Sequence, residues 1–577
     1  MPSPSIRAIL DLDPFGHLEL ADPIQLLAAD SLAQVRPVLR AAASAAAAGR
    51  WVAGFVCYEA APAFDPALRV RTPLRGPLAW FGVFEGTAEP SPREASEARL
   101  SGLAPDVARG EYARSVEAVR AALGRGDAYQ VNLSLRIRGR FEGDPVALYR
   151  RLHAAQGGRR SAFFRLGGRA IVSVSPELFF ERRGDLLTVR PMKGTARRGR
   201  FAEEDERLAA DLAASEKERA ENVMITDLMR NDVGRIACTG SVKVTELCAV
   251  ERYRTLHQMT STVEARLRPG TTLEDVFAAL FPCGSVTGAP KPSAMAIVAA
   301  QERTPRGPYC GAAGVVAPGG DAVFNVAIRT LDVDLETGEA TYGTGGGITW
   351  LSSPEAEWEE AIAKAKVLED PEPAFELLET MRLERGACTL LARHLARLEA
   401  SARHLGFCFD PPAVRAAFER EAALLAGGAY RLRLALEESG RVRFEAAVLP
   451  AVAAEPLPVA LAKEPVSRHD RLLFHKTSRR AVYEARRSEC PDAFDVVLQN
   501  EEGHLTELTI GNLVAEIGGA RFTPPREEGL LAGVFRAELL SRGEIRERPL
   551  RVAHLREARR LWLVNALRGW VPVRLIW

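Results

Sequence analysis

The chain has 577 residues, of which 47% are hydrophobic and 26% are charged, a composition typical of an ordinary globular protein with several domains. The 76 basic and 75 acidic residues leave a net charge of +1, so no overall field favours nucleic acid or an anionic membrane as a partner. No apolar run is long enough to span a membrane, and the first 20 residues lack a signal-peptide pattern. The eight cysteines form no CxxC pair, so we expect a reducing, cytoplasmic compartment.

The first part of the chain predicts helices and strands in mixed order. Leu27–Gly49 predicts a helix interrupted near Pro37, and Tyr112–Leu123 predicts a second helix. Tyr129–Arg138 alternates between apolar and polar residues, which predicts a strand whose polar face begins with Gln130. Further strands are predicted over 170–175, 178–182 and 186–190. No regular βαβ period connects these elements, which favours an α+β fold.

Two pairs of glutamates have helical spacing. Glu218 and Glu221 share one face of a predicted helix, and Glu357 and Glu360 share a face of another that Lys364 continues. Four carboxylates could together hold Mg²⁺, which prefers oxygen ligands. The spacing alone favours two solvated helix faces over a metal site, because such pairs are common on helices.

Lysine is rare, with only eight among the 76 basic residues, and glycine gathers in three loops. A lysine can act as a nucleophile once its pKa is lowered, whereas arginine stays protonated. The glycine-rich stretches at 284–291, 309–314 and 343–348 match neither a dinucleotide fingerprint nor a Walker sequence. Their glycines allow close backbone approach to an anionic ligand, although a plain turn is the alternative for each.

A break in composition divides the chain. Leu368–Ala374 is acidic and contains two prolines, which predicts an interdomain linker. In the second part, Phe494–Asn500 and Leu505–Ile517 predict a hairpin that carries Glu507. Gly533 is predicted to lie at a helix N-terminus, where free amides favour a phosphate.

The first part resembles the chorismate-utilising enzymes. The matching strings appear in family order between residues 111 and 367: GDAYQVNLS at 126–134, SPE at 175–177, PMKGT at 191–195, DLMRND at 227–232, CGSVTGAPK at 283–291, IRT at 328–330 and the stretch 345–364. AGFVCYE at 53–59 resembles the N-terminal subdomain of the amino-transferring members. This resemblance implies a helix-flanked β-sandwich and Mg²⁺ held by carboxylates that match Glu218, Glu221, Glu357 and Glu360.

Two positions indicate the branch of this family. The water-adding members have a lysine base where this chain has Gln130, and a neutral amide cannot activate water. Anthranilate synthases usually have a small residue at the position of Lys193, whereas aminodeoxychorismate synthases typically have this lysine. The resemblance implies that Lys193 attacks the chorismate ring, that Glu177 acts as general acid, and that ammonia then displaces the lysine. It also places His257 near the ring, and the substrate-binding positions it implies are Gln130, Thr287, Gly288, Tyr309, Arg329, Gly345, Gly346 and Lys364.

The second part resembles the fold-type IV pyridoxal-phosphate enzymes, which include aminodeoxychorismate lyase. The matching strings are ETMR at 379–382, HLARL at 394–398, KTSR at 476–479, ELTIGNLV at 507–514, LAGVFR at 531–536 and NALRG at 565–569. Lys476 matches the lysine that holds pyridoxal 5'-phosphate, and Glu507 matches the carboxylate beside the pyridine nitrogen. Arg397, Val534, Phe535 and Ala566 match the phosphate cup. The usual lead-in before Glu379, with its Tyr-Gly-x-Gly string, is absent.

Together the two resemblances imply a bifunctional enzyme that takes chorismate and ammonia to 4-aminobenzoate for folate, with Mg²⁺ and pyridoxal phosphate as cofactors. The implied domains are an N-terminal subdomain at 1–110, a chorismate-binding domain at 111–368, a linker at 369–374 and a pyridoxal-phosphate domain at 375–577. No glutaminase pattern is visible, so ammonia is expected from solution or from a separate glutamine amidotransferase subunit. A homodimer through the pyridoxal-phosphate domain is implied. The alternatives are an anthranilate-type synthase with a fused aminotransferase, or a synthase with a non-catalytic type IV module.

Overall fold

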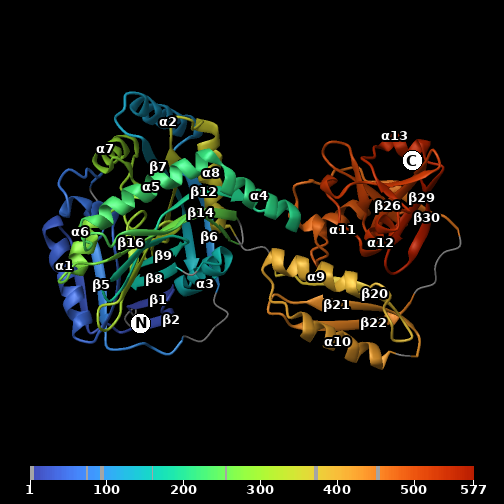
Figure 1. Ribbon diagram of the computed structural model, residues 1–577, viewed down its shortest axis with the longest axis horizontal. Helices are drawn as coiled ribbons and strands as arrows, with labels where there is room; N and C mark the ends of the chain where they lie inside the picture. Colours follow the sequence, from blue (N-terminus) through green and yellow to red (C-terminus); the bar gives the residue numbers. More distant parts are fainter. Residues whose placement is uncertain are drawn as a thin grey trace. The chain divides into compact units, whose positions relative to one another are not determined.

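The computed structural model describes residues 6–72, 76–90, 97–158, 160–253, 256–369, 374–425, 427–449 and 455–576. The chain divides into two compact units, which are described separately here (Figure 1). Unit 1 comprises Met1–Arg197 and Ala209–Pro371, and unit 2 comprises Arg198–Leu208 and Glu372–Trp577. Residues 198–208 therefore group with the C-terminal half, although nothing in the sequence distinguished them. Most of the predicted linker, residues 370–373, lies outside the described part of the chain.

Unit 1 contains two large, mainly antiparallel sheets. The first has the order β15–β7–β19–β18–β9–β8–β1–β2, with β6 also paired to β7. Its strands are β1 Arg7–Leu12, β2 Gly16–Ala21, β6 Ala98–Pro105, β7 Gln130–Gly143, β8 Arg160–Leu166, β9 Arg169–Ser175, β15 Gly288–Ala289, β18 Thr330–Asp334 and β19 Glu339–Ile348.

The second sheet of unit 1 has the order β12–β14–β11–β10–β17–β16–β4–β5–β3, with β13 paired to β14. Its strands are β3 Gln25–Ala29, β4 Trp51–Val56, β5 Ala79–Phe84, β10 Leu178–Arg183, β11 Leu186–Arg190, β12 Met192–Arg197, β13 Lys243–Arg252, β14 Leu256–Arg266, β16 Ala312–Val316 and β17 Ala322–Val326.

The two sheets face each other across a shared apolar core. Phe55 of β4 lies 5.9 Å, between ring centroids, from Phe164 of β8, and both side chains are fully buried. Residues from both sheets form one continuous hydrophobic cluster with these rings. This packing of two antiparallel sheets is a β-sandwich.

Helices cover the outer faces of the sandwich. α1 Leu32–Ala47, α5 Glu216–Gly234 and α6 Leu273–Leu280 bury their apolar faces with the second sheet. α2 Arg109–Gly124, α3 Pro145–Gln156, α7 Lys291–Gln301 and α8 Pro354–Ala365 do the same with the first sheet. α4 Ala202–Ala214 begins in unit 2 and ends in unit 1. The predicted helix-flanked β-sandwich and its α+β class are confirmed.

Two local predictions differ from the structure. The helix predicted over Leu27–Gly49 begins only at Leu32, because residues 27–29 belong to strand β3. Pro37 lies in the second turn of α1, and the helix continues through it to Ala47 although proline cannot donate the backbone hydrogen bond at this position. The return strand predicted over Leu505–Ile517 is two strands, because residues 509–510 form a turn.

Unit 2 contains a small and a larger sheet. The small sheet consists of β20 Leu377–Glu384, β21 Ala429–Leu436 and β22 Val442–Val448, and it packs against α9 Leu391–Leu405 and α10 Pro411–Leu424. The larger sheet has the order β25–β24–β23–β30–β29–β26–β27–β28. Its strands are β23 Leu457–Leu461, β24 Asp495–Gln499, β25 Leu505–Leu508, β26 Gly511–Ile517, β27 Ala520–Thr523, β28 Arg546–Glu547, β29 Arg560–Asn565 and β30 Gly569–Leu575.

Three further helices of unit 2 are α11 Ala481–Ser488, α12 Val534–Ser541 and α13 Val552–Glu557. Within the described ranges, no helix in either unit has both the length and the apolar character needed to cross a membrane.

Two candidate active sites

Unit 1 holds a polar cavity of about 240 Å³ between the sandwich and its helices. β7, β12 and β19 contribute strand residues to the wall, and α5 and α8 contribute acidic side chains. Most of the predicted site residues of the first part line it: Gln130, Glu177, Lys193, Glu218, Glu221, Tyr309, Arg329, Gly345, Gly346, Glu357, Glu360 and Lys364. Segments more than two hundred residues apart in sequence thus meet at one cavity.

Lys193 and Glu177 both line this cavity, and burial shifts the pKa of each side chain. Burial, with the charge of nearby Lys364, lowers the pKa of Lys193, which favours the neutral amine that a nucleophile needs. Burial raises the pKa of Glu177 to about 7, against the opposing effects of Ser285 and Lys193. A carboxyl group with this pKa is protonated in part of the population near neutral pH and can donate a proton.

Two buried polar groups of the cavity lack partners. Gln130 is 1% exposed, and within the described ranges neither atom of its amide has a hydrogen-bond partner. The same holds for one carboxylate oxygen of Glu177, Oε1, which is equally buried. Leaving such groups unpaired costs about 1–3 kcal/mol each, so their presence at one wall indicates a polar ligand that completes them.

The four predicted metal ligands approach the cavity from two helices, Glu218 and Glu221 from α5 and Glu357 and Glu360 from α8. Burial and the neighbouring carboxylates raise the pKa of Glu221 and of Glu357. Glu360 pairs with Lys364 Nζ at 2.6 Å, and this lysine holds the pKa of Glu360 below its usual value against the effect of burial. The group is therefore rich in negative charge that a cation would compensate.

The donor chemistry of these residues fits Mg²⁺. All four offer carboxylate oxygens, which a hard divalent cation prefers. Their carboxylate oxygens do not form a compact group of three or more ligand atoms in the folded chain. Mg²⁺ usually keeps several water ligands, so it needs only one or two direct carboxylates and tolerates this spacing.

Two glycines of β19, which have no side chains, leave room for the polar side chains that crowd the cavity wall. A Cβ atom at Gly347 would lie 2.2 Å from Gln130 Nε2 and 2.9 Å from Lys193 Nζ. A Cβ at Gly346 would lie 2.8 Å from Glu357 Oε2. Any side chain at these positions would therefore displace the groups that line the cavity.

Three predicted residues of unit 1 are not among those that line the cavity. His257 is fully buried in β14, and its strand neighbour Gln258 lines the cavity instead, because successive side chains of a strand point to opposite faces. The Thr287 hydroxyl donates to the carbonyl oxygens of Cys283 and Gly284. Gly288 pairs with Val131 of β7, where a Cβ would lie 2.1 Å from the Gln130 carbonyl oxygen.

The sequence analysis did not name several residues that line the first cavity. They include Asn132, Gln258, Ser285 and Tyr342. The alternation along β7 already put Asn132 on the same face as Gln130, so that signal was available. No sequence pattern indicated Tyr342 as a cavity residue, because it lies just before the glycine-rich run of β19. Its hydroxyl donates to the Lys364 carbonyl oxygen, a contact that forms only in the folded chain.

Unit 2 holds a second cavity, of about 390 Å³. Of the residues predicted for pyridoxal phosphate, Arg397, Lys476, Glu507, Val534 and Ala566 line it. Burial and the charge of Arg397 lower the pKa of Lys476 to about 8, which makes its neutral amine available near physiological pH. Phe535, whose backbone amide was the predicted phosphate contact, is not among the lining residues, and its ring packs edge-on against Trp570.

Glu507 is buried in this wall, and burial raises its pKa to about 7 against the opposing effects of neutral hydrogen-bond donors and of the charges of Lys476 and Arg480. The neutral donors are the Tyr483 hydroxyl at 2.9 Å, the Leu531 amide at 3.1 Å and the Asn512 side-chain amide at 3.3 Å. A protonated pyridine nitrogen would add a positive partner for this carboxylate, so Glu507 fits the cofactor that the sequence predicts.

Arg397 is oriented by Glu379, which the sequence analysis mentioned only within a motif. Arg397 Nε donates to Glu379 Oε1 at 2.8 Å, and Arg397 Nη2 donates to Glu379 Oε2 at 2.6 Å. The helix α12 begins after Gly533, and both Gly533 and Val534 line this cavity. The first backbone amides of the helix therefore lie at the cavity wall. A fixed guanidinium and a helix N-terminus together fit a phosphate group.

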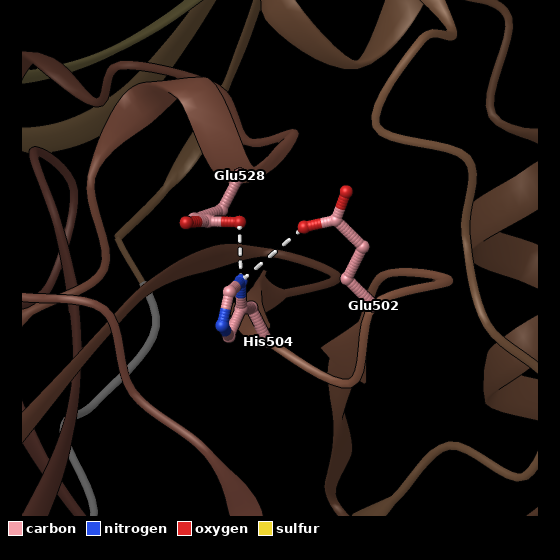
Figure 2. Close-up of side chains that lie close together, drawn as sticks. All are labelled: Glu502, His504 and Glu528. Atoms are coloured by element: carbon pink, nitrogen blue, oxygen red, sulfur yellow. Dashed lines mark hydrogen bonds and ion pairs between the residues drawn. The ribbon is translucent and has the colours of Figure 1, made fainter.

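A third group of potential metal ligands in unit 2 belongs to neither cavity (Figure 2). His504 Nδ1 lies 2.9 Å from Glu528 Oε2 and 3.9 Å from Glu502 Oε2. Asn500 also donates to Glu528 at 2.9 Å, and Arg468 pairs with Glu502 at 2.7 Å. Protein donors thus already bind these carboxylates, and the group is a hydrogen-bonding network within unit 2.

The comparisons agree with this two-part architecture. Residues 8–370 match the chorismate binding enzyme family, and residues 376–576 match the amino-transferase class IV family. The crystal structure of anthranilate synthase component I from Streptococcus pneumoniae TIGR4 superposes with a TM-score of 0.54 at 27% identity, over 64% of this chain and 92% of that one.

Curated relatives carry two different names. Aminodeoxychorismate synthase component 1 of Salmonella typhimurium is 40% identical over 285 residues, which cover 49% of this chain and 62% of the relative. Anthranilate synthase component 1 1 of Haloarcula marismortui is 39% identical over 282 residues, which cover 49% of this chain and 57% of the relative. The chain thus spans about three fifths of the length of these relatives. It belongs to the chorismate-binding enzyme family and carries a class IV aminotransferase domain in its second part.

Proposed function

We propose that unit 1 is an aminodeoxychorismate synthase and that the class IV domain is an aminodeoxychorismate lyase, so that the chain makes 4-aminobenzoate from chorismate and ammonia. The observation that carries this proposal is the position of Lys193, a half-buried side chain that lines the same cavity as the acid Glu177. The relatives do not separate this function from anthranilate synthesis, because both names occur at about 40% identity. The lysine at 193 supports the aminodeoxychorismate branch.

In unit 1, the neutral amine of Lys193 forms a bond to the chorismate ring while the C4 hydroxyl leaves. Glu177 gives its proton to that hydroxyl, which departs as water. Ammonia then displaces the lysine nitrogen and leaves an amino group at C4. Arg329 and Tyr309 hold the pyruvyl carboxylate, and the unpaired amide of Gln130 binds a polar group of the substrate.

The carboxylates of α5 and α8 would hold Mg²⁺, which supplies positive charge against the substrate carboxylate. The metal would be held at the cavity by Glu218, Glu221, Glu357 and Glu360. Lys364 positions Glu360 through the ion pair between them.

In unit 2, Lys476 holds the cofactor and then moves the C4 proton of the substrate, so that pyruvate leaves as the ring becomes aromatic. Pyridoxal phosphate, when bound, supplies an electron sink. Glu507 keeps the pyridine nitrogen protonated, while Arg397 and the first amides of α12 bind the phosphate. The fit of these four groups to one cavity supports the lyase assignment over a non-catalytic module.

The partners follow from the chemistry. A separate glutamine amidotransferase subunit supplies ammonia, and a second copy of the chain pairs through the class IV domain. All eight cysteines are free, which accords with a reducing cytoplasm.

Product analysis tests the proposed function. The purified chain is incubated with chorismate, Mg²⁺ and ammonium, with and without pyridoxal phosphate, and the products are separated by chromatography. We expect aminodeoxychorismate without the second cofactor, and 4-aminobenzoate with pyruvate when it is present. Formation of 2-aminobenzoate would instead identify an anthranilate synthase. Accumulation of aminodeoxychorismate under both conditions would identify a non-catalytic class IV domain.

A further inference from the structure

Residues 198–208 belong to unit 2, yet in sequence they directly follow β12, the strand that carries Lys193. The buried residues of this segment include Arg198, Arg200 and Phe201, with exposed fractions of 8%, 8% and 6%. Long arginine side chains are seldom buried unless their donors are used. Their burial therefore indicates specific contacts within unit 2.

The two arginines bind backbone carbonyl oxygens of unit 2. Arg200 Nη1 donates to the carbonyl oxygens of Arg468 and Glu527, at 3.0 and 3.1 Å. Arg198 Nη2 donates to the His404 carbonyl oxygen at 3.1 Å. These bonds attach the segment to three separate places in the fold of unit 2.

Phe201 completes an apolar cluster next to Lys476. Its ring centroid lies 5.3 Å from that of Phe474, and both rings belong to one cluster with Val466 and Leu473. The guanidinium of Arg526 lies 4.0 Å above the Phe201 ring, which adds a cation–π contact. The cluster therefore includes the residue two positions before Lys476.

His475 connects the segment to Lys476 directly. Its Nε2 lies 3.1 Å from the Arg200 carbonyl oxygen, and its Nδ1 lies 2.9 Å from the Ser401 hydroxyl. Burial and neighbouring His404 lower the pKa of His475 to about 3, so the ring is neutral and has a single N–H group. Because a carbonyl oxygen only accepts, Nε2 carries that hydrogen and donates it to Arg200.

The backbone of Lys476 is thus held from two sides. On one side, the Lys476 carbonyl oxygen accepts a hydrogen bond of 2.7 Å from the Leu378 amide of β20. On the other side, Phe474 and His475 are fixed by Phe201 and Arg200. The first contact comes from the class IV domain, whereas the second comes from a segment that the first half of the sequence supplies.

We propose that residues 198–208 are a positioning element of the second cavity, which holds Phe474 and His475 and so fixes where Lys476 presents its amine. The class IV site is then complete only with a segment encoded within the chorismate-binding region. The role of Lys476 in holding pyridoxal phosphate is taken from the proposed function, whereas the ordering of residues 473–478 by the segment does not depend on it.

Phe201→Ala in the full chain tests this inference, with Phe418→Ala as the matched control. Phe418 is equally buried in unit 2, at 3% exposure, but it packs in the cluster of α9 and α10. Backbone hydrogen exchange is measured in the cofactor-free protein for residues 473–478, and the dissociation constant of pyridoxal phosphate is measured from its absorbance change. We expect Phe201→Ala to raise both the exchange rates and the dissociation constant by at least about tenfold, and Phe418→Ala to change neither by more than about twofold.

Equal effects of the two substitutions on exchange at residues 473–478 would overturn the proposal, since Phe201 would then act only through general stability. If Phe201→Ala does not fold, His475→Ala and His475→Gln make the same comparison. The glutamine amide can still donate to the Arg200 carbonyl oxygen, so only His475→Ala should loosen the segment, and equal behaviour of the two would likewise overturn the proposal.

A wild-type chain that binds pyridoxal phosphate no more tightly than Lys476→Ala would contradict the proposed function of the second cavity. The exchange measurement would still decide the positioning role.

Discussion

Arg397 and Glu379 form a bidentate pair in unit 2, with two N–H···O bonds of 2.8 and 2.6 Å. Burial opposes the charge of Glu379, but Arg397 and His394 outweigh that effect and hold the pKa of Glu379 at about 2. The pair thus places a guanidinium at the second cavity and makes the folding of unit 2 depend on pH.

The first prediction concerns that dependence. The folded pKa of Glu379 lies below its ordinary value of 4.5, so its ionisation stabilises the fold above pH 4.5 and this contribution is lost as pH falls towards 2. Glu379→Gln should lower the free energy of unfolding at pH 7 by about 3 kcal/mol, and the difference from wild type should shrink below pH 4.5. Thermal unfolding of the cofactor-free protein at several pH values measures this.

Glu384→Gln is the control for Glu379→Gln, because Glu384 is an exposed residue of the same strand. It should leave the unfolding curve unchanged at every pH. A Glu379→Gln deficit that stays constant down to pH 2.5 would contradict the assigned ionisation.

The sequence indicated which residues line the cavities better than it indicated how the fold brings those residues together. Helical spacing put Glu218 with Glu221 and Glu357 with Glu360, but only the folded chain brings α5 and α8 to one cavity. The position of His257 was inferred from the family resemblance, and in the folded chain this residue is fully buried in β14 while its strand neighbour Gln258 lines the cavity. Residues 198–208 are rich in charged residues, but this composition does not show what they bind, since their role depends on contacts with residues more than two hundred positions away.

The second prediction concerns the nucleophile. Lys193→Ala should reduce aminodeoxychorismate formation to background, because no other group supplies the bond to the ring. Lys193→Arg should be equally inactive, since a guanidinium remains protonated. The rate is measured by product chromatography with chorismate, Mg²⁺ and ammonium, and Lys243→Arg, on β13 outside the cavity, is the control. Normal turnover by Lys193→Arg would exclude a covalent role.

The third prediction concerns the acid. Glu177 has a pKa of about 7, so the fraction that can donate a proton falls as pH rises through 7. At constant free ammonia, kcat/KM for amination should show a descending limb with its midpoint near pH 7. Glu177→Gln should lower kcat/KM by about 10²–10⁴-fold and remove this limb. Persistence of the limb in Glu177→Gln would assign it to another group.

The fourth prediction concerns the metal. Glu357→Gln removes one negative charge from the cavity, so the Mg²⁺ concentration for half-maximal amination should rise at least about tenfold. Calorimetric titration of Mg²⁺ gives the same change without turnover, and a chelator should abolish amination by the wild type. Glu359→Gln is the matched control, because Glu359 lies on the same helix with a 66% exposed side chain paired to Arg109. Equal Mg²⁺ requirements for both variants would contradict the proposed ligand set.

The last prediction concerns the order of the two reactions. Lys476→Ala should stop 4-aminobenzoate formation but let aminodeoxychorismate accumulate, because the amine in unit 1 is intact. Lys193→Ala should make neither product from chorismate, yet it should convert added aminodeoxychorismate. A mixture of the two variants should therefore make 4-aminobenzoate after a lag, since the intermediate is a released small molecule. Timed product assays on each variant and on the mixture measure this. A mixture that stays inactive, while each variant performs its own half-reaction, would show that the intermediate passes between the sites without entering solution.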